Sequence, residues 1–209
     1  MFFLVGERVT GKTKDAGISA CAVCGDDEHF SHVVETNYFS LFGLPLLPIE
    51  KLADYYRCDR CNNSYADLLV ELPTQVPVLQ RTLSYILLGY GQTGKSDLIR
   101  DICLKLCGFD YSAEEMRKAA IQLESGQSLF MEYLRSEASR INSQGKMQII
   151  EAAFLMTYIC CEIQYEDRLR VNLIGNALGV SLEFVEYAVQ QVRENGYYGV
   201  RRLVPVESD

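Results

Sequence analysis

The chain has 209 residues, a hydrophobic content of 48% and a formal net charge of −8 at pH 7. A nucleic-acid-binding protein needs a basic surface that displaces the counterions of the phosphates. Both halves of this chain are acidic, so we expect no nucleic-acid partner. No stretch approaches the 18 or more apolar residues of a membrane-spanning helix, which predicts no membrane span and leaves peripheral membrane association open.

Residues 1–5 are apolar but too few for a secretory signal peptide, and no basic segment precedes them. Without an export signal, the eight cysteines are expected to be reduced or bound to metal, as in the cytoplasm. In residues 1–72 the pattern predicts short strands and turns. The candidate strands are 2–5, 32–42 and 55–58, and turn-rich connections are expected at 6–17 and 43–48.

Two Cys-x-x-Cys pairs, Cys21 with Cys24 and Cys58 with Cys61, are separated by 33 residues. Four thiolates that arrive as two such pairs complete a tetrahedral zinc shell and leave no position open for a substrate. The spacing therefore predicts one structural Zn²⁺ ion. The alternatives are disulfides or a thioredoxin-like redox motif, but a redox pair should open a helix in a βαβ unit, and neither pair does.

A β domain as small as residues 1–72 buries too little apolar surface to fold alone, which gives the metal a structural role. His29 and His32 are the only histidines and could lend a ligand if one cysteine failed. Since four cysteines already complete the shell, we expect both histidines to be surface residues.

From residue 78 onward apolar residues recur at helical spacing, after a hinge at 72–77. Ser112 and Glu115 form a capping box, Ser181 is a favourable N-cap, and Gly108 and Gly179 stand where helix C-caps belong. The predicted fold is α+β as a whole: a small β zinc ribbon at 1–72 and an all-helical domain at 73–209. The candidate helices are 78–89, 96–107, 113–124, 127–140, 145–160, 166–178 and 182–194.

The opening hexapeptide, the two cysteine pairs and segments 37–42 and 44–48 together resemble the zinc-ribbon module often found before a TerB domain. Residues 78–194 are similar to the TerB-like helical family, which is named for tellurite resistance. The best matches are 98–108, 112–115 and 145–179. The resemblance implies a helical bundle and a role in bacterial stress- or membrane-associated assemblies.

The TerB-like hallmark is an Ala-Asp-Gly triplet followed by a glutamate, which occurs twice and is linked to binding of a divalent ion. At these positions the chain has Tyr90 with Asp97 and Cys160 with Asp167, so both hallmark aspartates are replaced. A hard cation such as calcium requires six or more oxygen ligands. We therefore expect that this metal site is lost and that Asp97 and Asp167 cap helices.

Residues 6–13 and 89–96 both match the P-loop pattern Gly-x-x-x-x-Gly-Lys-Ser/Thr. A nucleotide-binding enzyme that uses 89–96 is therefore an alternative function. A P-loop needs a strand before it and a helix after it, and the residues around 89–96 have helical spacing. We expect 89–96 to be an inter-helix loop and 6–13 a hairpin turn.

Two other groups of residues have competing interpretations. The aromatic residues of 38–42 and 55–56 could stack on single-stranded nucleic acid, but without basic residues beside them, burial or a protein-docking patch is the favoured interpretation. Four further cysteines are expected to pack in the helical core, as free cysteines commonly do. They are Cys103, Cys107, Cys160 and Cys161.

The sequence as a whole favours a non-enzymatic protein-interaction or scaffold protein with one zinc ion at Cys21, Cys24, Cys58 and Cys61. Its partner is expected to be another protein, which the sequence does not identify. The alternatives are the nucleotide-binding enzyme and nucleic-acid binding through the zinc ribbon.

Overall fold

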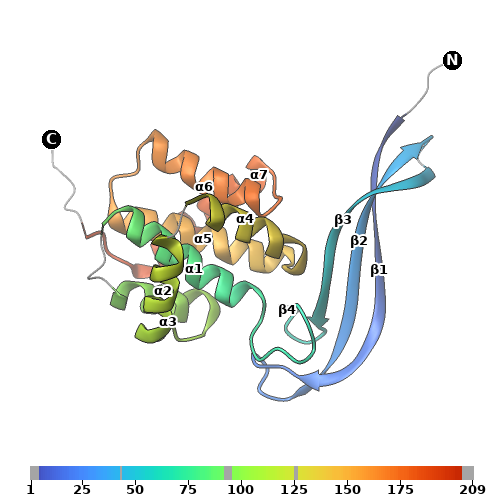
Figure 1. The fold of residues 1–209 in the computed structure, drawn as a ribbon, viewed down its shortest axis with the longest axis horizontal. Helices are drawn as coiled ribbons and strands as arrows, with labels where there is room; N and C mark the ends of the chain where they lie inside the picture. The colour runs from blue at the N-terminus through green and yellow to red at the C-terminus, as the bar shows by residue number, and fades with distance from the viewer. Residues whose placement is uncertain (1–4, 43, 92–95, 125–126, 204–209) are drawn as a thin grey trace. The chain divides into compact units, whose positions relative to one another are not determined.

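The computed structural model describes residues 5–42, 44–91, 96–124 and 127–203, and the chain divides into two compact units (Figure 1). The first unit is the chain up to Thr74 together with Ser139–Gln144, and the second is Gln75–Ala138 with the residues from Gly145 onward. The first contains a sheet and the second contains helices, which confirms the predicted α+β class. In the described part of the chain, no helix is long and apolar enough to cross a membrane.

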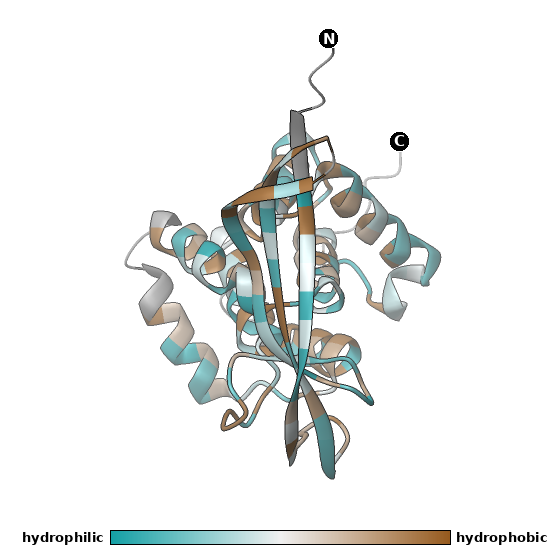
Figure 2. Ribbon diagram, turned by 90° about the vertical axis from the view of Figure 1, so that its right-hand side faces the viewer, coloured by the Kyte–Doolittle hydropathy of each residue, from teal (hydrophilic) through white to brown (hydrophobic). Residues whose placement is uncertain are grey.

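The sheet of the first unit has four antiparallel strands in the order β1-β2-β3-β4. They are β1 (Val5–Ala20), β2 (Asp27–Leu41), β3 (Leu44–Cys58) and β4 (Ser64–Tyr65). The first three are long strands that lie side by side (Figure 2), whereas β4 pairs with β3 only at Tyr56 and Arg57. Over most of its length, β3 is therefore an edge strand of the described sheet.

The predicted turn at residues 6–17, with a hairpin turn at 6–13, is wrong. Strand β1 runs through this segment and pairs residue by residue with β2, from Val5 opposite Leu41 to Asp15 opposite Ser31. The only irregularity is a bulge between Asp15 and Gly17, where Gly17 has a φ of 86°. The glycines suggested turns, but the long ladder with β2 outweighs this local preference. The predicted strand at 2–5 lies mostly outside the described residues.

The predicted connection at 43–48 is also wrong for residues 44–48, because β3 begins at Leu44. Pro45 and Pro48 lie within the strand, opposite Ser40 and Tyr38. Proline is tolerated in a strand at an edge or a bulge. This part of β3 is an edge of the described sheet, and its register with β2 shifts just before Tyr38 and just after Phe39.

The second unit confirms the seven predicted helices, with ends that agree closely with the predicted ones. The largest differences are three residues: α1 begins at Gln75, within the predicted hinge, and α4 ends at Glu137 and continues as a 3-10 turn over Ala138–Arg140. The helices are α1 (Gln75–Gly89), α2 (Ser96–Cys107), α3 (Ala113–Glu124), α4 (Gln127–Glu137), α5 (Ser143–Cys160), α6 (Tyr165–Ala177) and α7 (Leu182–Glu194).

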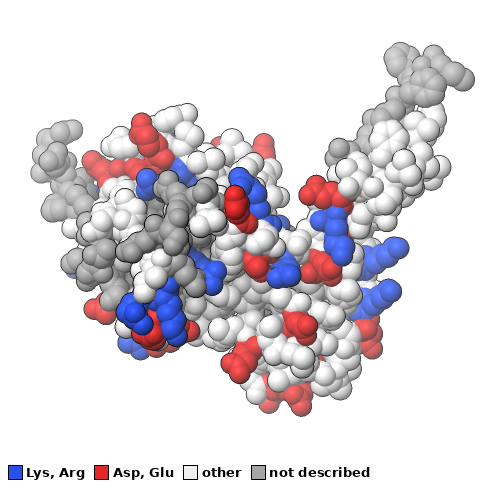
Figure 3. Space-filling model, viewed as in Figure 1, with Lys and Arg blue, Asp and Glu red and all other residues white. Residues whose placement is uncertain are grey.

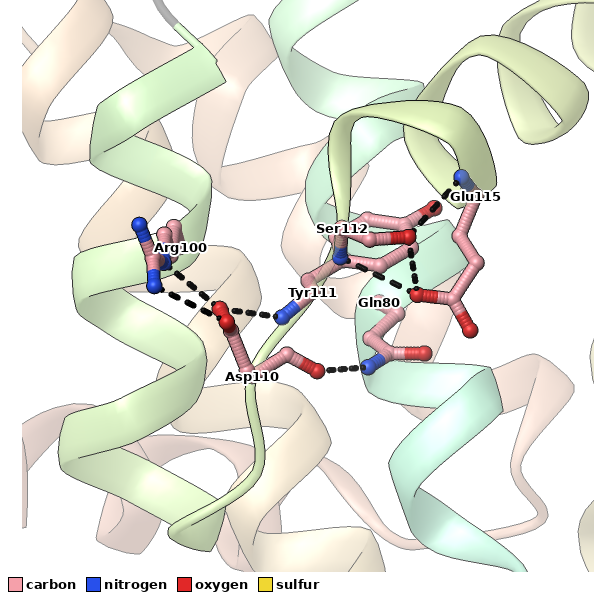
Figure 4. Close-up of polar contacts among 6 residues, drawn as sticks. All are labelled: Gln80, Arg100, Asp110, Tyr111, Ser112 and Glu115. Carbon is pink, nitrogen blue, oxygen red and sulfur yellow. Dashed lines mark hydrogen bonds and ion pairs between the residues drawn. The ribbon is translucent and has the colours of Figure 1, made fainter.

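The predicted helix caps are confirmed. Ser112 and Glu115 exchange hydrogen bonds at the start of α3: the Ser112 amide donates to the Glu115 carboxylate at 3.0 Å, and the Glu115 amide donates to the Ser112 hydroxyl at 3.2 Å (Figure 4). The Ser181 hydroxyl accepts the Phe184 amide at 3.3 Å. Gly108 and Gly179 follow α2 and α6 with φ of 76° and 70°, which L-residues rarely adopt.

The connection between α2 and α3 is held by Asp110. Its carboxylate accepts two hydrogen bonds from the Arg100 guanidinium, at 2.7 and 2.9 Å, and its carbonyl accepts one from Gln80 of α1 at 3.1 Å (Figure 4). Arg100 holds the pKa of Asp110 below its usual range. One residue thus ties the α2–α3 connection to α2 through its side chain and to α1 through its carbonyl.

Every residue of helix α5 from Ile149 to Thr157 is buried. A helix segment that is buried on all sides and mostly apolar belongs in a protein interior. Its neighbours supply further fully buried side chains, among them Leu83, Ile102 and Leu134. The core of the second unit is therefore built around α5.

Helices α6 and α7 approach closely at Gly175. A Cβ atom at this position would lie 2.3 Å from Cγ2 of Val185. We expect Gly175→Ala to lower the free energy of unfolding of the helical unit by about 1–3 kcal/mol, the usual range for overpacking. Thermal unfolding checks this, with Gly89→Ala as the control because a Cβ there meets nothing within 4 Å. If Val185→Ala does not relieve the effect of Gly175→Ala, the close approach is not its cause.

Candidate metal centre

The two cysteine pairs form knuckles with the same backbone hydrogen bonds. In the first, the Gly25 amide donates to the Cys21 carbonyl at 2.9 Å and the Cys21 amide donates to the Asp26 carbonyl at 3.0 Å. In the second, Asn62 donates to Cys58 at 2.9 Å and Cys58 donates to Asn63 at 3.1 Å. Gly25 and Asn62 both have positive φ, 77° and 60°, so each loop turns back immediately after its second cysteine.

The strands bring these two knuckles together at one end of the sheet. Cys21 follows β1, Cys24 lies in the loop before β2, Cys58 ends β3 and Cys61 precedes β4. The second knuckle is also bonded directly to β2, since the Asp59 amide donates to the His29 carbonyl at 2.9 Å. The long β1–β2–β3 pairing therefore holds two sequence-distant loops in register.

The four thiols form one cluster in which all sulfur atoms lie within 4.8 Å of one another. Sγ of Cys21 lies 3.6 Å from Sγ of Cys61, and Sγ of Cys24 lies 3.9 Å from Sγ of Cys58. A tetrahedron with metal–sulfur bonds of about 2.3 Å has edges of about 3.8 Å. These separations fit a metal ion and far exceed the length of a disulfide bond, about 2.05 Å. All eight cysteines are free.

Two polar side chains contact the sulfur atoms from outside the cluster. The Tyr65 hydroxyl lies 3.3 Å from Sγ of Cys21, and Nδ2 of Asn63 donates to Sγ of Cys61 at 3.3 Å. Donors to metal-bound thiolates orient the ligands and offset their negative charge. Nothing in the sequence pattern indicated these two residues, because their role depends on how the short strand β4 pairs with β3.

Aromatic packing encloses the cluster. The Tyr65 ring packs edge-on against Phe30 at a centroid distance of 5.4 Å, and both side chains are buried together with Cys21 and Cys58. This is the small core of the first unit at the knuckle end. It depends on four polarizable sulfur atoms as well as two rings, which explains why so few apolar residues suffice there.

The protonation of the thiols reflects their crowding. Burial alone would raise the pKa of Cys21, but hydrogen bonds from the Tyr65 hydroxyl and from the backbone of Cys24 and Val23 lower it to about 7. Burial raises the pKa of Cys58, and burial with the neighbouring thiols raises that of Cys24. The arrangement disfavours four thiolates unless a cation compensates their charge, which is the electrostatic requirement of a metal site.

The histidines do not join this cluster. His29 is exposed, and His32 lies along β2, where its ring stacks on Tyr56 at 4.8 Å and its Nε2 lies 2.7 Å from the Asp54 carboxylate. That carboxylate also accepts from Lys51 at 2.8 Å, and these two partners keep the pKa of Asp54 low.

The four cysteines of the helical unit lie apart from the cluster. Cys103 and Cys160 are buried in the helical core, as predicted, while Cys107 and Cys161 are only partly buried. Burial raises the pKa of Cys160 to about 12 and also raises that of Cys103. These thiols are therefore neutral and behave as small apolar side chains.

Asp167, one of the two aspartates expected to cap a helix, has a clear structural role. Its carboxylate accepts the Gln164 amide at 2.9 Å at the start of α6, together with a hydrogen bond from the Tyr90 hydroxyl. Asp97, its counterpart in the first turn of α2, is exposed. Among the described residues, the four-cysteine cluster is the one group of potential metal ligands.

The two P-loop matches lie in different settings. Residues 6–13 are in the middle of β1, and Gly89 is the last residue of helix α1. A phosphate-binding loop follows a β-strand, whereas the described residues on both sides of the second match are helical. Residues 92–95, which include the lysine of this match, lie outside the described residues.

The expectation that the aromatic residues have no basic neighbours is wrong for the first unit. The register of β1 with β2 places Arg8 opposite Tyr38 and Lys14 opposite His32, and Tyr56 lies next to His32 on β3. Linear sequence hides this proximity, because the partners are about 20 to 30 residues apart. Tyr55, by contrast, is buried with Val33 and Ala53 on the other face of the sheet.

Known proteins give no further guidance on this centre. No family model, no curated protein and no solved structure matches the chain. The assignment of the candidate metal centre therefore depends on its geometry: two equivalent knuckles and four thiols at the separations of a tetrahedral shell.

Proposed function

We propose that the first unit is a zinc ribbon in which one structural Zn²⁺ ion is bound by Cys21, Cys24, Cys58 and Cys61. The observation that carries the proposal is the convergence of their four sulfur atoms within 4.8 Å. Four protein ligands fill a tetrahedral shell, and a catalytic zinc ion keeps one position for water or substrate. The ion would thus stabilise the fold and take no part in a reaction.

A tetrahedral set of four sulfur ligands suits zinc or iron. Metal-bound thiolates in either case need the amide and hydroxyl donors that surround this cluster. We propose zinc because the proposed role of the ion is to stabilise the fold of a small β unit, which requires no redox chemistry. Iron would keep the same four ligands and would add a redox function.

The purified full-length protein is expected to contain one zinc ion per chain. Of its eight cysteines, four should resist a thiol-specific reagent until a chelator removes the metal. Elemental analysis and thiol titration before and after chelation check this expectation. Protein produced with zinc available that contains no metal would contradict the proposal, and stoichiometric iron would contradict the choice of zinc.

We further propose that the chain acts as a non-enzymatic interaction protein in the cytoplasm, with a TerB-like helical unit and a role in stress-linked bacterial assemblies. The support comes from the resemblance of the sequence, the consecutive helix pairs α1–α2 and α5–α6, which we call the two helical hairpins, and the closed thiol shell. Affinity purification from the native host with mass spectrometry tests it. Proteins that bind the first unit should no longer co-purify with the Cys58→Ser variant. They should still co-purify with Cys107→Ser, because Cys107 lies outside the cluster.

A further inference from the structure

The end of the sheet opposite the knuckles is apolar and exposed. Residues 39–49 contain no charged side chain, and every described residue from Leu44 to Ile49 is exposed. Phe42, Leu44 and Leu47 are 61%, 65% and 66% exposed. We call the described residues of this segment, 39–42 and 44–49, the apolar end. Figure 2 shows brown stretches there, and Figure 3 shows uncharged atoms beyond the charged side chains of the sheet.

Both faces of the apolar end carry apolar side chains. Side chains of directly opposed residues in a sheet lie on the same face, and neighbours along a strand alternate. Leu44 and Leu47 lie opposite Leu41 and Phe39 on one face, while Pro45 and Pro48 lie opposite Ser40 and Tyr38 on the other. A partner that covers one face of a sheet would leave the other apolar face in water.

The same register separates charges between the two faces. Arg8, Lys12 and Lys14 of β1 share a face with His32, Tyr38 and Tyr56, and Lys51 joins them opposite Thr36. We call this side the lysine face. The acidic groups that the register places on it are Asp54, which binds His32 and Lys51, and Glu28 near the knuckles, which accepts a hydrogen bond from Arg60. The opposite face carries Asp15, Glu35 and Glu50, with Arg57 as its cation.

We propose that the first unit binds an anionic lipid bilayer, with the apolar end inserted at the interface and the lysine face turned toward the headgroups. Hydrocarbon can surround both faces of the apolar end at once, and anionic headgroups complement the exposed lysines of one face. The acidic opposite face is directed away from the membrane. This charge asymmetry orients a chain whose net charge of −8 would otherwise be repelled.

The distance between the apolar end and the lysines of the lysine face requires the sheet to lie obliquely on the membrane. Lys12 pairs with Val34, eight positions before Phe42 on β2. At about 3.3 Å per residue this is about 26 Å, well beyond the screening length of about 8 Å at physiological ionic strength. An upright sheet would leave Lys12 and Lys14 too far from the headgroups to contribute.

The prolines of the apolar end favour a bilayer over a second copy of the chain. Pro45 and Pro48 have no N–H, so this part of the β3 edge is poorly suited to pairing with another strand. The main obstacle to placing a sheet edge in lipid is that its unpaired backbone N–H groups lose their water. Because the prolines have no N–H, fewer such groups are present at the apolar end.

Binding of the full-length, metal-loaded protein to phosphatidylcholine vesicles with and without phosphatidylserine tests the proposal. We expect binding that requires phosphatidylserine. Replacing Lys12 and Lys14 with alanine should weaken it about fivefold for each lysine, because one cation near an anionic membrane contributes about 1 kcal/mol. Leu44→Ser with Leu47→Ser should weaken it at least tenfold, since both leucines would otherwise be buried in lipid.

Matched variants on the helical unit are the controls. Leu173→Ser with Leu182→Ser removes leucines that are 56% and 51% exposed, and Arg117→Ala with Lys118→Ala removes two exposed cations. Both should leave vesicle binding unchanged. The chain has no tryptophan, so Leu47→Trp supplies a single reporter whose emission should shift to shorter wavelength on anionic vesicles only. Metal content confirms that each variant is folded around its centre.

Four binding outcomes and one change of oligomeric state would overturn the proposal. The first three are no binding to anionic vesicles, binding that the Leu44 and Leu47 variants do not weaken, and binding equally strong to neutral vesicles. The fourth is tight binding of single-stranded nucleic acid that depends on Lys12 and Lys14 but not on the leucines. A dimer in solution that the leucine variants convert to monomer would assign the apolar end to a second copy instead.

Discussion

Cys58→Ser is expected to abolish metal binding and to unfold the sheet of the first unit, while the helices of the second unit remain. Cys58 is fully buried, and its sulfur lies 3.9 Å from that of Cys24 across the cluster. Structural zinc ions contribute on the order of 10–16 kcal/mol to the folding of zinc-finger peptides. A loss of this size equals or exceeds the stability of most domains, about 5–15 kcal/mol.

Elemental analysis and amide NMR of the full chain check this expectation. The amide signals of β1, β2 and β3 should collapse to unfolded positions, and those of α5 should keep their dispersion. Cys107→Ser is the matched control, because this thiol donates to the Cys103 carbonyl within α2 at 3.1 Å and serine can do the same. A Cys58→Ser protein that retains one zinc ion and a folded sheet would show that the shell does not need this ligand.

The helices of the second unit could be predicted from sequence because local residues determine their ends. Ser112 and Ser181 satisfy amides within one turn, and Gly108 and Gly179 adopt a φ that suits glycine. These interactions span three or four residues, so a linear pattern contains them. The four metal ligands were predictable for a similar reason, since each pair is closed by hydrogen bonds within five residues.

The predicted strands at 32–42 and 55–58 fall almost wholly within β2 and β3, but most of β1 and the first part of β3 could not be predicted because their pairing is not local. Strand β1 contains Gly6, Gly11 and Gly17, and only the ladder with β2 shows that the first two lie in regular strand. The same holds for Asn142, which belongs to the first unit although its neighbours in sequence are helical. Its amide donates to the Ser64 hydroxyl at 3.1 Å, across 78 residues of chain.

Tyr90 and Asp167 form a polar pair that joins the two helical hairpins. Tyr90 follows α1 and donates its hydroxyl to Oδ1 of Asp167 in α6, while Oδ2 accepts the Gln164 amide at 2.9 Å. The Arg170 guanidinium lies over the Tyr90 ring at 4.7 Å. Both carboxylate oxygens are thus engaged by groups of the protein, and Asp167 is buried.

Asp167→Ala should lower the free energy of unfolding of the helical unit by about 2–4 kcal/mol at pH 7. Loss of the cap costs about 1 kcal/mol, and the Tyr90 hydroxyl left without its acceptor costs about 1–3 kcal/mol more. In Tyr90→Phe the hydroxyl is absent, so Asp167→Ala should be less harmful in that background. Denaturant unfolding of the four variants measures the coupling, which is expected to be about 0.5–3 kcal/mol for a pair in contact.

The pH dependence separates this pair from a simple packing effect. Burial alone would raise the pKa of Asp167, but the hydrogen bonds from Tyr90 and Gln164 lower it below its usual value. A carboxyl with a lowered pKa in the folded state adds stability above its unfolded pKa of about 3.9, and this stability is lost as the pH falls through the folded pKa. The destabilisation by Asp167→Ala should therefore be full at neutral pH and shrink in acid.

Asp97→Ala is the matched control, because Asp97 stands in the first turn of α2 as Asp167 does in α6 but is exposed. Its loss should cost only about 0.3–1 kcal/mol through the helix dipole. Millimolar calcium should leave the free energy of unfolding of the unsubstituted protein and of Asp97→Ala unchanged, since Tyr90 and Gln164 already engage the two oxygens of Asp167. Stabilisation by calcium that disappears in Asp167→Ala would instead show that this carboxylate binds a cation. The Tyr90 hydroxyl would then have to release the carboxylate when the cation binds.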